Sequence, residues 1–339
     1  MKKAGKIFIW ASLAAIVLWI VPWLYNLVSL KGYHSPFTLY SCTVHDFCAL
    51  DRGDGREFKF YDTKGGVHGE EAQPLFYASV LASKGMLPDT LEGRKVTLEE
   101  IEHNSLIISS DPKDVNRTSA PVYLLLESVP ERLELKDPED ALISRKDGIC
   151  VYNMESNSLL EEKTAQLKEA LDKEGFTYPA KLFAGNPSHR KEYDEGYLVT
   201  DSDDRLFQIK QVNGILEVRS FPLADNIHAK HLIITEFDNH ATLGLLVSGE
   251  GKMAFLRPDG EVVLTEVPFN PAKEDLLLVG DIFYYTVKLS DSKGERFWAL
   301  RSDDFSLVSS YERPYPDEFT LPGIRFTSGN DRWVKPRWR

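Results

Sequence analysis

In the stretch Leu198-Val-Thr-Asp-Ser-Asp-Asp-Arg-Leu-Phe207, the first three residues and Phe207 are echoed by Leu246-Val-Ser248 and Phe255, at a shift of 48 residues. A second echo, at a shift of 44, relates Leu256-Arg-Pro-Asp259 to Leu300-Arg-Ser-Asp303. Around both, from about residue 196 onward, polar and apolar residues alternate between recurrent turn residues, which is typical of antiparallel strands. A four-stranded propeller blade takes about 40–50 residues. The spacing therefore predicts an antiparallel β body over 191–325, built as a propeller that earlier strands complete, as a meander or as a sandwich.

The segment before this body, 32–190, mixes helix and strand patterns. The expected elements are a hairpin over 37–61 that turns at Asp51-Arg-Gly-Asp-Gly55, helices near 71–84, after Thr97 and over about 158–174, and strands at 106–108, 122–126 and 149–152. Capping boxes mark two helix starts, because Glu100 follows Thr97 and Glu161 follows Ser158 by three residues. We therefore expect an α+β chain, with a mixed α/β segment followed by the β body.

Residues 7–30 form an apolar run that contains no charge. As a helix it would be about 36 Å long, enough to cross a membrane. Lys2, Lys3 and Lys6 precede the run and Lys31 alone follows it, so the positive-inside rule keeps the N-terminus in the cytoplasm. A cleaved signal peptide would have a shorter apolar core and a small-x-small site. Residues 1–31 are thus expected to be a single-pass anchor in the cytoplasmic (inner) membrane, with the rest outside the cytoplasm.

Charge excludes one class of partner. Residues 32–339 hold 36 basic and 52 acidic residues, a net charge of −16. Sequence-independent binding of nucleic acid needs a basic face, so we expect no nucleic-acid partner. The exception to the acidic character is the tail 326–339, where Arg332, Trp333, Lys335, Arg337, Trp338 and Arg339 gather. Arg and Trp are enriched at binding hot spots and suit headgroups, so this tail is a candidate interaction segment, or else it pairs with the protein's own acids.

Cys42, His45 and Cys48 form a Cys-x-x-His-x-x-Cys pattern. Thiolates and imidazole suit zinc or copper, but the motif supplies no fourth ligand. If 42–48 is one strand, both cysteines share a face and His45 points to the other, so the three would not converge. The alternatives are two small side chains in a half-buried strand, or a disulfide from one of them to Cys150. We predict no metal site.

Two loops carry further candidates. The loop that leads into the β body is rich in polar and aromatic residues, namely Asn186, His189, Arg190, Tyr193 and Asp194. It is either a functional loop or a crossover between strands that needs unusual backbone conformations. Asp201-Ser-Asp-Asp204 resembles the start of a calcium loop but lacks the Gly and Glu that an EF-hand needs at its sixth and twelfth positions, so it is read as a hairpin turn.

The order Phe37-Thr-Leu-Tyr-Ser-Cys-Thr-Val-His-Asp-Phe47, Ala184-Gly-Asn-Pro-Ser-His-Arg190 and Tyr193-Asp-Glu-Gly-Tyr197 resembles a family of uncharacterised membrane-anchored envelope proteins, classed as a domain of unknown function. The resemblance covers most of the chain. It implies the anchored topology and supplies no catalytic residues.

The sequence contains no Gly-x-Ser-x-Gly, His-Glu-x-x-His, phosphate-binding or dinucleotide motif, which disfavours an enzyme, and no cofactor is predicted. The leading hypothesis is an accessory or interaction module of an envelope complex, for example a transporter, with an envelope protein as its partner. The alternative is an envelope hydrolase or a ligand-binding sensor whose site lies on the loops of the β body.

Overall fold

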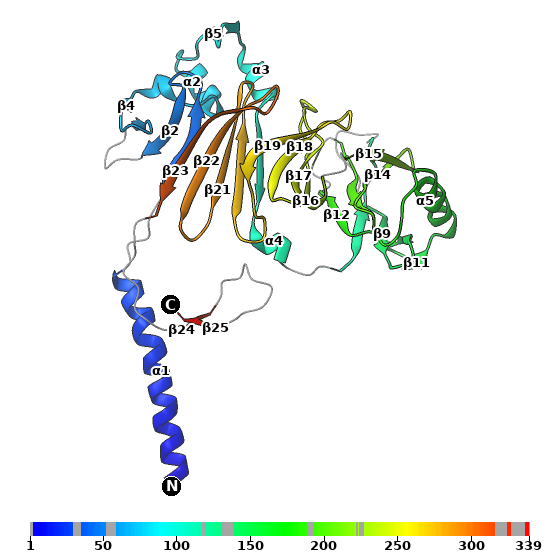
Figure 1. Ribbon diagram of the computed structural model, residues 1–339, viewed down its shortest axis with the longest axis horizontal. Coiled ribbons are helices and arrows are strands. Elements are labelled where there is room, and N and C mark those ends of the chain that lie inside the picture. The colour runs from blue at the N-terminus through cyan, green and yellow to red at the C-terminus, as the bar shows by residue number, and fades with distance from the viewer. Residues whose placement is uncertain are drawn as a thin grey trace.

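The structure is a computed structural model that describes residues 3–29, 35–51, 59–116, 120–129, 138–188, 191, 193–221, 223, 227–315, 324–326 and 336–338. Figure 1 shows a long helix, α1, that projects from an elongated body of β-sheets. Within these ranges the body also contains several shorter helices.

Helix α1 (Lys3–Ser29) is apolar on every side. Its residues 3–21 have a mean hydropathy of 2.1, and none of them is buried. Phe8, Trp10 and Leu18 are each at least 70% exposed, whereas a core helix of the same composition would be covered by other elements. An uncovered apolar helix of this length at the N-terminus has the properties of a membrane anchor or of a signal peptide.

In the part of the chain that is described, the frame of the body is five antiparallel sheets, each built mainly from four strands that follow one another in the chain. They are β1 (Phe37–Ser41), β2 (Asp46–Asp51), β3 (Lys59–Tyr61) and β4 (Val67–His68); β8 (Val122–Leu125), β9 (Asp140–Ser144), β10 (Ile149–Asn153) and β11 (Ser158–Leu159); β12 (Leu182–Gly185), β13 (Tyr197–Thr200), β14 (Leu206–Val212) and β15 (Ile215–Phe221); β16 (Ala229–Ile234), β17 (Gly244–Ser248), β18 (Lys252–Leu256) and β19 (Val262–Pro268); and β20 (Asp275–Gly280), β21 (Tyr284–Ser290), β22 (Gly294–Arg301) and β23 (Leu307–Pro314). A fifth strand, β7 (Leu106–Ser110), pairs with β20.

Several smaller elements lie outside these five sheets. They are the 3₁₀ turns η1 (Glu70–Ala72) and η2 (Leu75–Tyr77), the helices α2 (Ala78–Ser83), α3 (Leu98–His103), α4 (Pro112–Asn116) and α5 (Glu161–Lys173), and the hairpins β5 (Thr90–Leu91) with β6 (Arg94–Lys95) and β24 (Ile324–Phe326) with β25 (Pro336–Trp338).

The sheets stack face to face, and the inner ones bury both faces. Side chains alternate along a strand, so Leu245 and Val247 pack against the β20–β23 sheet while Leu246 packs against the β12–β15 sheet. Four hydrophobic clusters of this kind give the spatial order β1–β4, β20–β23, β16–β19, β12–β15, β8–β11, with α5 completing the last interface. The predicted antiparallel β body is therefore confirmed.

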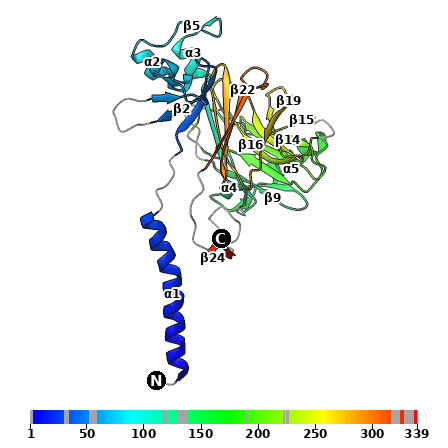
Figure 2. The ribbon, with the colours of Figure 1, turned by 60° about the vertical axis from the view of Figure 1, so that its left-hand side comes forward.

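The stack is open. Figures 1 and 2 place the β1–β4 sheet and the β8–β11 sheet toward opposite ends of the body, and no hydrophobic cluster among the described residues joins these two sheets. The sheets thus resemble propeller blades in strand number and in face-to-face packing, while they form a line instead of a closed ring.

The two sequence echoes differ in what they match. The echo at a shift of 44 relates structurally equivalent residues. Leu256 and Leu300 each lie in the third strand of their sheet, and each faces the sheet that precedes its own in the chain. The shift of 48 relates equivalent strands, but Leu198 faces the following sheet and Leu246 the preceding one. An echo displaced by one residue reverses the face, because side chains alternate with period two.

Asp residues begin several of the hairpin turns. Asp62, Asp201, Asp281 and Asp291 each accept hydrogen bonds from backbone N–H groups two to four residues further on. Such bonds favour a tight reversal of the chain, which explains why Asp recurs between the strands. The turn over Asp201–Asp204 is one of these, as the sequence predicts.

Four local expectations need correction. Residues 42–45 form a turn between β1 and β2, so 37–50 is not one strand. The helix expected near 71–84 is interrupted after η1 by Pro74, which starts η2. The N-cap of α5 is Leu160, without a side-chain bond, because Ser158 pairs with Asn153 in β11. The predicted boundary at residue 190 falls between β12 and β13, which are neighbours in one sheet.

Candidate functional site

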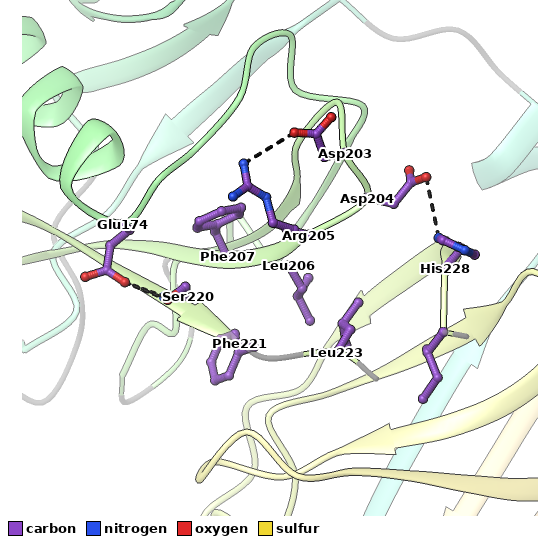
Figure 3. A pocket seen from close by; sticks show the side chains of 11 residues that line it. Glu174, Asp203, Asp204, Arg205, Leu206, Phe207, Ser220, Phe221, Leu223 and His228 are labelled. Atoms are coloured by element: carbon purple, nitrogen blue, oxygen red, sulfur yellow. Dashed lines mark hydrogen bonds and ion pairs between the residues drawn. The ribbon is translucent and has the colours of Figure 1, made fainter. Parts of the chain in front are cut away.

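A pocket of about 620 Å³ opens where the β12–β15 sheet meets the β16–β19 sheet (Figure 3). Three parts of the chain meet there: the turn between β13 and β14, the end of β15 with the segment that leads to β16, and the C-terminal end of α5. The pocket lies at the strand ends of two packed sheets, so rigid elements hold its walls.

The floor of this pocket is apolar. Leu206, Phe207, Phe221 and Ile227 line it, and each is at most 6% exposed. Leu206, Phe221 and Ile227 belong to the cluster between the two sheets, whereas Phe207 belongs to the cluster on the far side of the β12–β15 sheet. The floor is therefore the edge of the protein's own core, fixed in shape by its packing.

The rim of the pocket is charged, and its charged groups are already paired. Glu174 Oε2 accepts a hydrogen bond of 2.6 Å from Ser220 Oγ. Asp204 lies 2.6 Å from Lys181 Nζ and 3.6 Å from His228 Nδ1. Arg205 Nη2 lies 3.6 Å from Asp203 Oδ2. The three carboxylates of Glu174, Asp203 and Asp204 stand against two cations, Arg205 and Lys181, so the rim has a net negative charge.

Asp201 holds this rim in place from below. Its side chain is fully buried, and Arg205 Nη2 lies 2.7 Å from Oδ2. Oδ1 accepts bonds from the backbone N–H groups of Asp203 and Arg205, both at 2.9 Å, and Oδ2 accepts one of 3.1 Å from Thr177. A carboxylate with this many donors is well compensated for its burial.

The predicted loop at 186–194 lies at the opposite ends of the same strands and forms a second cluster. Lys191 Nζ is 2.5 Å from Asp194 Oδ1 and 2.6 Å from Glu236 Oε1, and all three side chains are at most 10% exposed. Burial raises the pKa of Glu236, although the hydrogen bonds that its carboxylate accepts from Lys191 and from the Glu195 N–H act to lower it. Asn186 Nδ2 also donates to Glu236, at 2.8 Å.

This cluster closes the crossover between β12 and β13. Tyr193 donates to the Phe237 carbonyl at 2.9 Å, and its ring lies 4.5 Å from that of His240. Burial raises the pKa of Tyr193 above its ordinary range. Lys191 and Glu236 are the partners that sequence reasoning missed, because Glu236 is 45 residues away and only the packing of the two sheets brings it here. His189 and Arg190 lie outside the described residues.

The Cys-x-x-His-x-x-Cys residues do not converge. Cys42 shares the face of Tyr40 and Phe47 in the core, whereas the pairing of Cys48 with Leu39 places it on the other face. His45 sits in the turn with φ of 56° and lies 3.5 Å from Glu92. Burial raises the pKa of both thiols to about 12, which disfavours the thiolate that a metal needs. In the part of the chain that is described, no group of three His, Cys, Asp or Glu side chains is arranged to hold a metal.

Cys150 belongs to β10, in the sheet at the other end of the stack, and all three cysteines are free thiols. Of the basic-aromatic tail, Arg337 and Trp338 fall in β25, while Arg332, Trp333, Lys335 and Arg339 lie outside the described residues.

One family model, described as a domain of unknown function (DUF4857), matches residues 37–300. The matched range contains the pocket, the buried cluster and most of the five sheets, and excludes α1 and the tail. No curated protein matches the sequence.

Among solved structures, the chain is similar to the propeller of Dos1, at 9% identity over 52% of this chain and 46% of that one, with a TM-score of 0.31. It is also similar to apo AztD from Citrobacter koseri, at 12% identity over 88% of this chain and 64% of that one, again with a TM-score of 0.31. PorZ of Porphyromonas gingivalis, a surface component of the type-IX secretion system, is 11% identical over 89% of this chain and 36% of that one, with a TM-score of 0.24. The chain thus spans about half to two thirds of the length of the first two.

Proposed function

The chain belongs to this family of domains of unknown function, DUF4857, and we propose that it is a membrane-tethered accessory protein that binds an envelope protein partner through the pocket between the β12–β15 and β16–β19 sheets. The pocket carries the proposal. It combines an apolar, core-supported floor with a charged rim, which is the anatomy of a protein-binding hot spot.

The state of the rim favours recognition over catalysis. A general base or a nucleophile has to be within reach of the substrate with its reactive group available. Here the carboxylates of Glu174 and Asp204 are engaged by Ser220 and Lys181, and Arg205 is engaged by Asp201. A hydrolase acting in this pocket would have to break these pairs first, whereas a binding partner can dock on them as they stand.

The tether is the second part of the proposal. Helix α1 exposes an apolar surface on every side, and three lysines precede its apolar run whereas one follows it. An uncleaved α1 would place its N-terminus in the cytoplasm and the β body outside the cytoplasmic membrane. The partner then has to be a protein of the same compartment or of the same membrane.

The charge of the rim indicates which surface of the partner binds. A net negative rim attracts a basic side chain and repels phosphate or carboxylate groups. The apolar floor is suited to an aliphatic or aromatic side chain, and 620 Å³ is enough for a few side chains. The expected partner segment therefore has Lys or Arg next to a large apolar residue.

Photo-crosslinking in intact cells tests this function. A photoreactive phenylalanine replaces His228, whose side chain is 60% exposed at the rim. We expect an adduct with an envelope protein that Asp203→Lys suppresses and that Glu266→Lys, a charge reversal at an exposed position on β19, leaves unchanged. Absence of an adduct, or an adduct that responds equally to both reversals, would contradict the proposal.

A further inference from the structure

The strand from which the C-terminal segment leaves is fastened to the residues that follow α1. Arg313, near the end of β23, donates from Nη2 to Ser35 Oγ at 2.8 Å and to the Pro36 carbonyl at 3.0 Å. Its Nη1 donates to Thr38 Oγ1 at 2.9 Å. Because Arg313 is only 12% exposed, these bonds are shielded from water and hold the two segments side by side.

This fastening limits how far the C-terminal segment can start from α1. The helix ends at Ser29, and Ser35 follows six residues later. Six residues span at most about 22 Å, whatever path they take. The end of β23 is therefore close to the end of α1, and so to the surface of any membrane that holds α1.

The C-terminal segment has the chemistry of a membrane surface ligand. Residues 324–339 contain five basic residues and one acid, in contrast to the −16 of residues 32–339. The register of β24 and β25 pairs Arg325 with Arg337, while Ile324 pairs with Trp338 and Phe326 with Pro336. The register therefore brings two basic positions directly opposite each other, between two apolar pairs.

We propose that the β24–β25 ribbon lies on the anionic phospholipid headgroups of the membrane that holds α1. The proposal rests on the proposed function in one respect, the role of α1 as an anchor. An isolated two-stranded ribbon is marginal in water, so it needs a surface against which to settle. Each Lys or Arg near an anionic leaflet contributes about 1 kcal/mol. The acidic body is repelled by the same leaflet, so the ribbon supplies the local attraction that the body lacks.

The test uses the full chain reconstituted in phosphatidylcholine vesicles, with or without phosphatidylglycerol, and with lipids brominated near the headgroup as quenchers. The emission of Trp338 is isolated by subtracting that of a Trp338→Phe variant. We expect it to be quenched in the anionic vesicles, several-fold less in phosphatidylcholine alone, and several-fold less at high salt.

Charge variants complete the test. Arg325→Gln with Arg337→Gln should abolish the extra quenching, whereas Arg145→Gln with Lys146→Gln, which removes the same charge from the exposed turn between β9 and β10, should not. Equal quenching in both vesicle types, or no effect of the ribbon variant, overturns the proposal. Protection of Trp338 from an aqueous quencher without quenching by lipid would mean that a protein surface covers the ribbon, which also overturns it. If alkaline carbonate released the protein from membranes, the anchor itself would fail, and the two failures are thus distinguishable.

Discussion

Arg313 and Glu295 form a buried ion pair that joins the last two strands of the body to the residues after α1. Nη2 and Nε of Arg313 lie 2.5 Å and 2.9 Å from Glu295 Oε2, and the glutamate side chain is 1% exposed. Lys288 Nζ approaches the other carboxylate oxygen at 2.5 Å. One carboxylate thus connects β21, β22 and β23, and its arginine partner extends the connection to Ser35.

Arg313→Gln should destabilise the protein by about 2–4 kcal/mol. The substitution leaves Glu295 buried with Lys288 as its remaining cation, and loss of one partner of a buried pair is costly. The free energy of unfolding in urea, measured by circular dichroism on the detergent-solubilised chain, gives the value. Lys168→Gln is the matched control, because its partner Asp172 forms a surface pair, and it should change stability by less than about 1 kcal/mol. Equal effects of the two substitutions would mean that the Arg313 pair does not matter.

Glu295 should also make stability fall in acid. Burial opposes its ionisation, but hydrogen bonds from Lys288, Ser35 and Arg313 outweigh burial and lower its pKa. The unfolded chain takes up this proton near pH 4.3, before the folded protein does. The stabilisation is therefore complete above that pH and is lost as the pH falls through the lowered pKa. In Glu295→Gln the difference from the parent protein should shrink on acidification, and a constant difference would contradict this origin.

Asp281 should act in the opposite direction. Burial raises its pKa to about 6, although the N–H groups of Tyr284 and Phe283 partly offset this. The folded protein then keeps the proton that the unfolded chain releases near pH 3.9, so stability is lost as the pH rises through about 6. Between pH 4 and pH 7 we expect a loss of about 2–3 kcal/mol, which Asp281→Asn should remove because the amide oxygen can still accept both bonds. Ser302→Ala is the control, because Ser302 donates to the Ile282 carbonyl beside the same turn and carries no titratable group.

The sequence predicts the elements of this fold better than their arrangement. The apolar residues Leu245–Val247 predict a strand of the β body, because the signal for a strand is local, and the structure buries the strand on both faces. Whether the five sheets close into a ring depends on which sheet faces pack together. The sequence does not indicate which sheet a buried residue such as Leu198 or Leu246 contacts. The echo at a shift of 48 shows the limit, since it relates equivalent strands on opposite faces.

The candidate sites divide in the same way. Asp201–Asp204 could be identified as a turn because the aspartate acts on residues that follow it closely in the chain. Glu174 and His228, which join that turn at the pocket, come from α5 and from the entry to β16, and no local pattern connects them. The faces of Cys42 and Cys48 could not be assigned because the prediction treated the turn between them as part of a strand.

The helix caps offer a direct test of one correction. Thr97 Oγ1 accepts the Glu100 N–H at 3.2 Å and caps α3, as the capping box predicts. Ser158 has no such bond, because α5 starts after Leu160. Thr97→Ala should therefore cost about 1 kcal/mol of unfolding free energy, and Ser158→Ala less than about 0.5 kcal/mol. A cost for Ser158→Ala that equals that of Thr97→Ala would support a capping box at the start of α5 after all.

Gly196 lies at the end of the loop 186–194, directly before β13, and should tolerate no side chain. Its φ is 68°, and a Cβ there would lie 2.1 Å from the carbonyl oxygen of Ile209, which is backbone and cannot move aside alone. At Gly93, with φ of 74°, a Cβ would have no atom within 4 Å, so only the left-handed conformation opposes alanine there. Gly93→Ala should cost about 1 kcal/mol, whereas Gly196→Ala has to displace β14 from β13 and should cost about 3 kcal/mol or more. Urea unfolding of the two variants separates strain from collision, and similar costs would show that the contact with Ile209 relaxes freely.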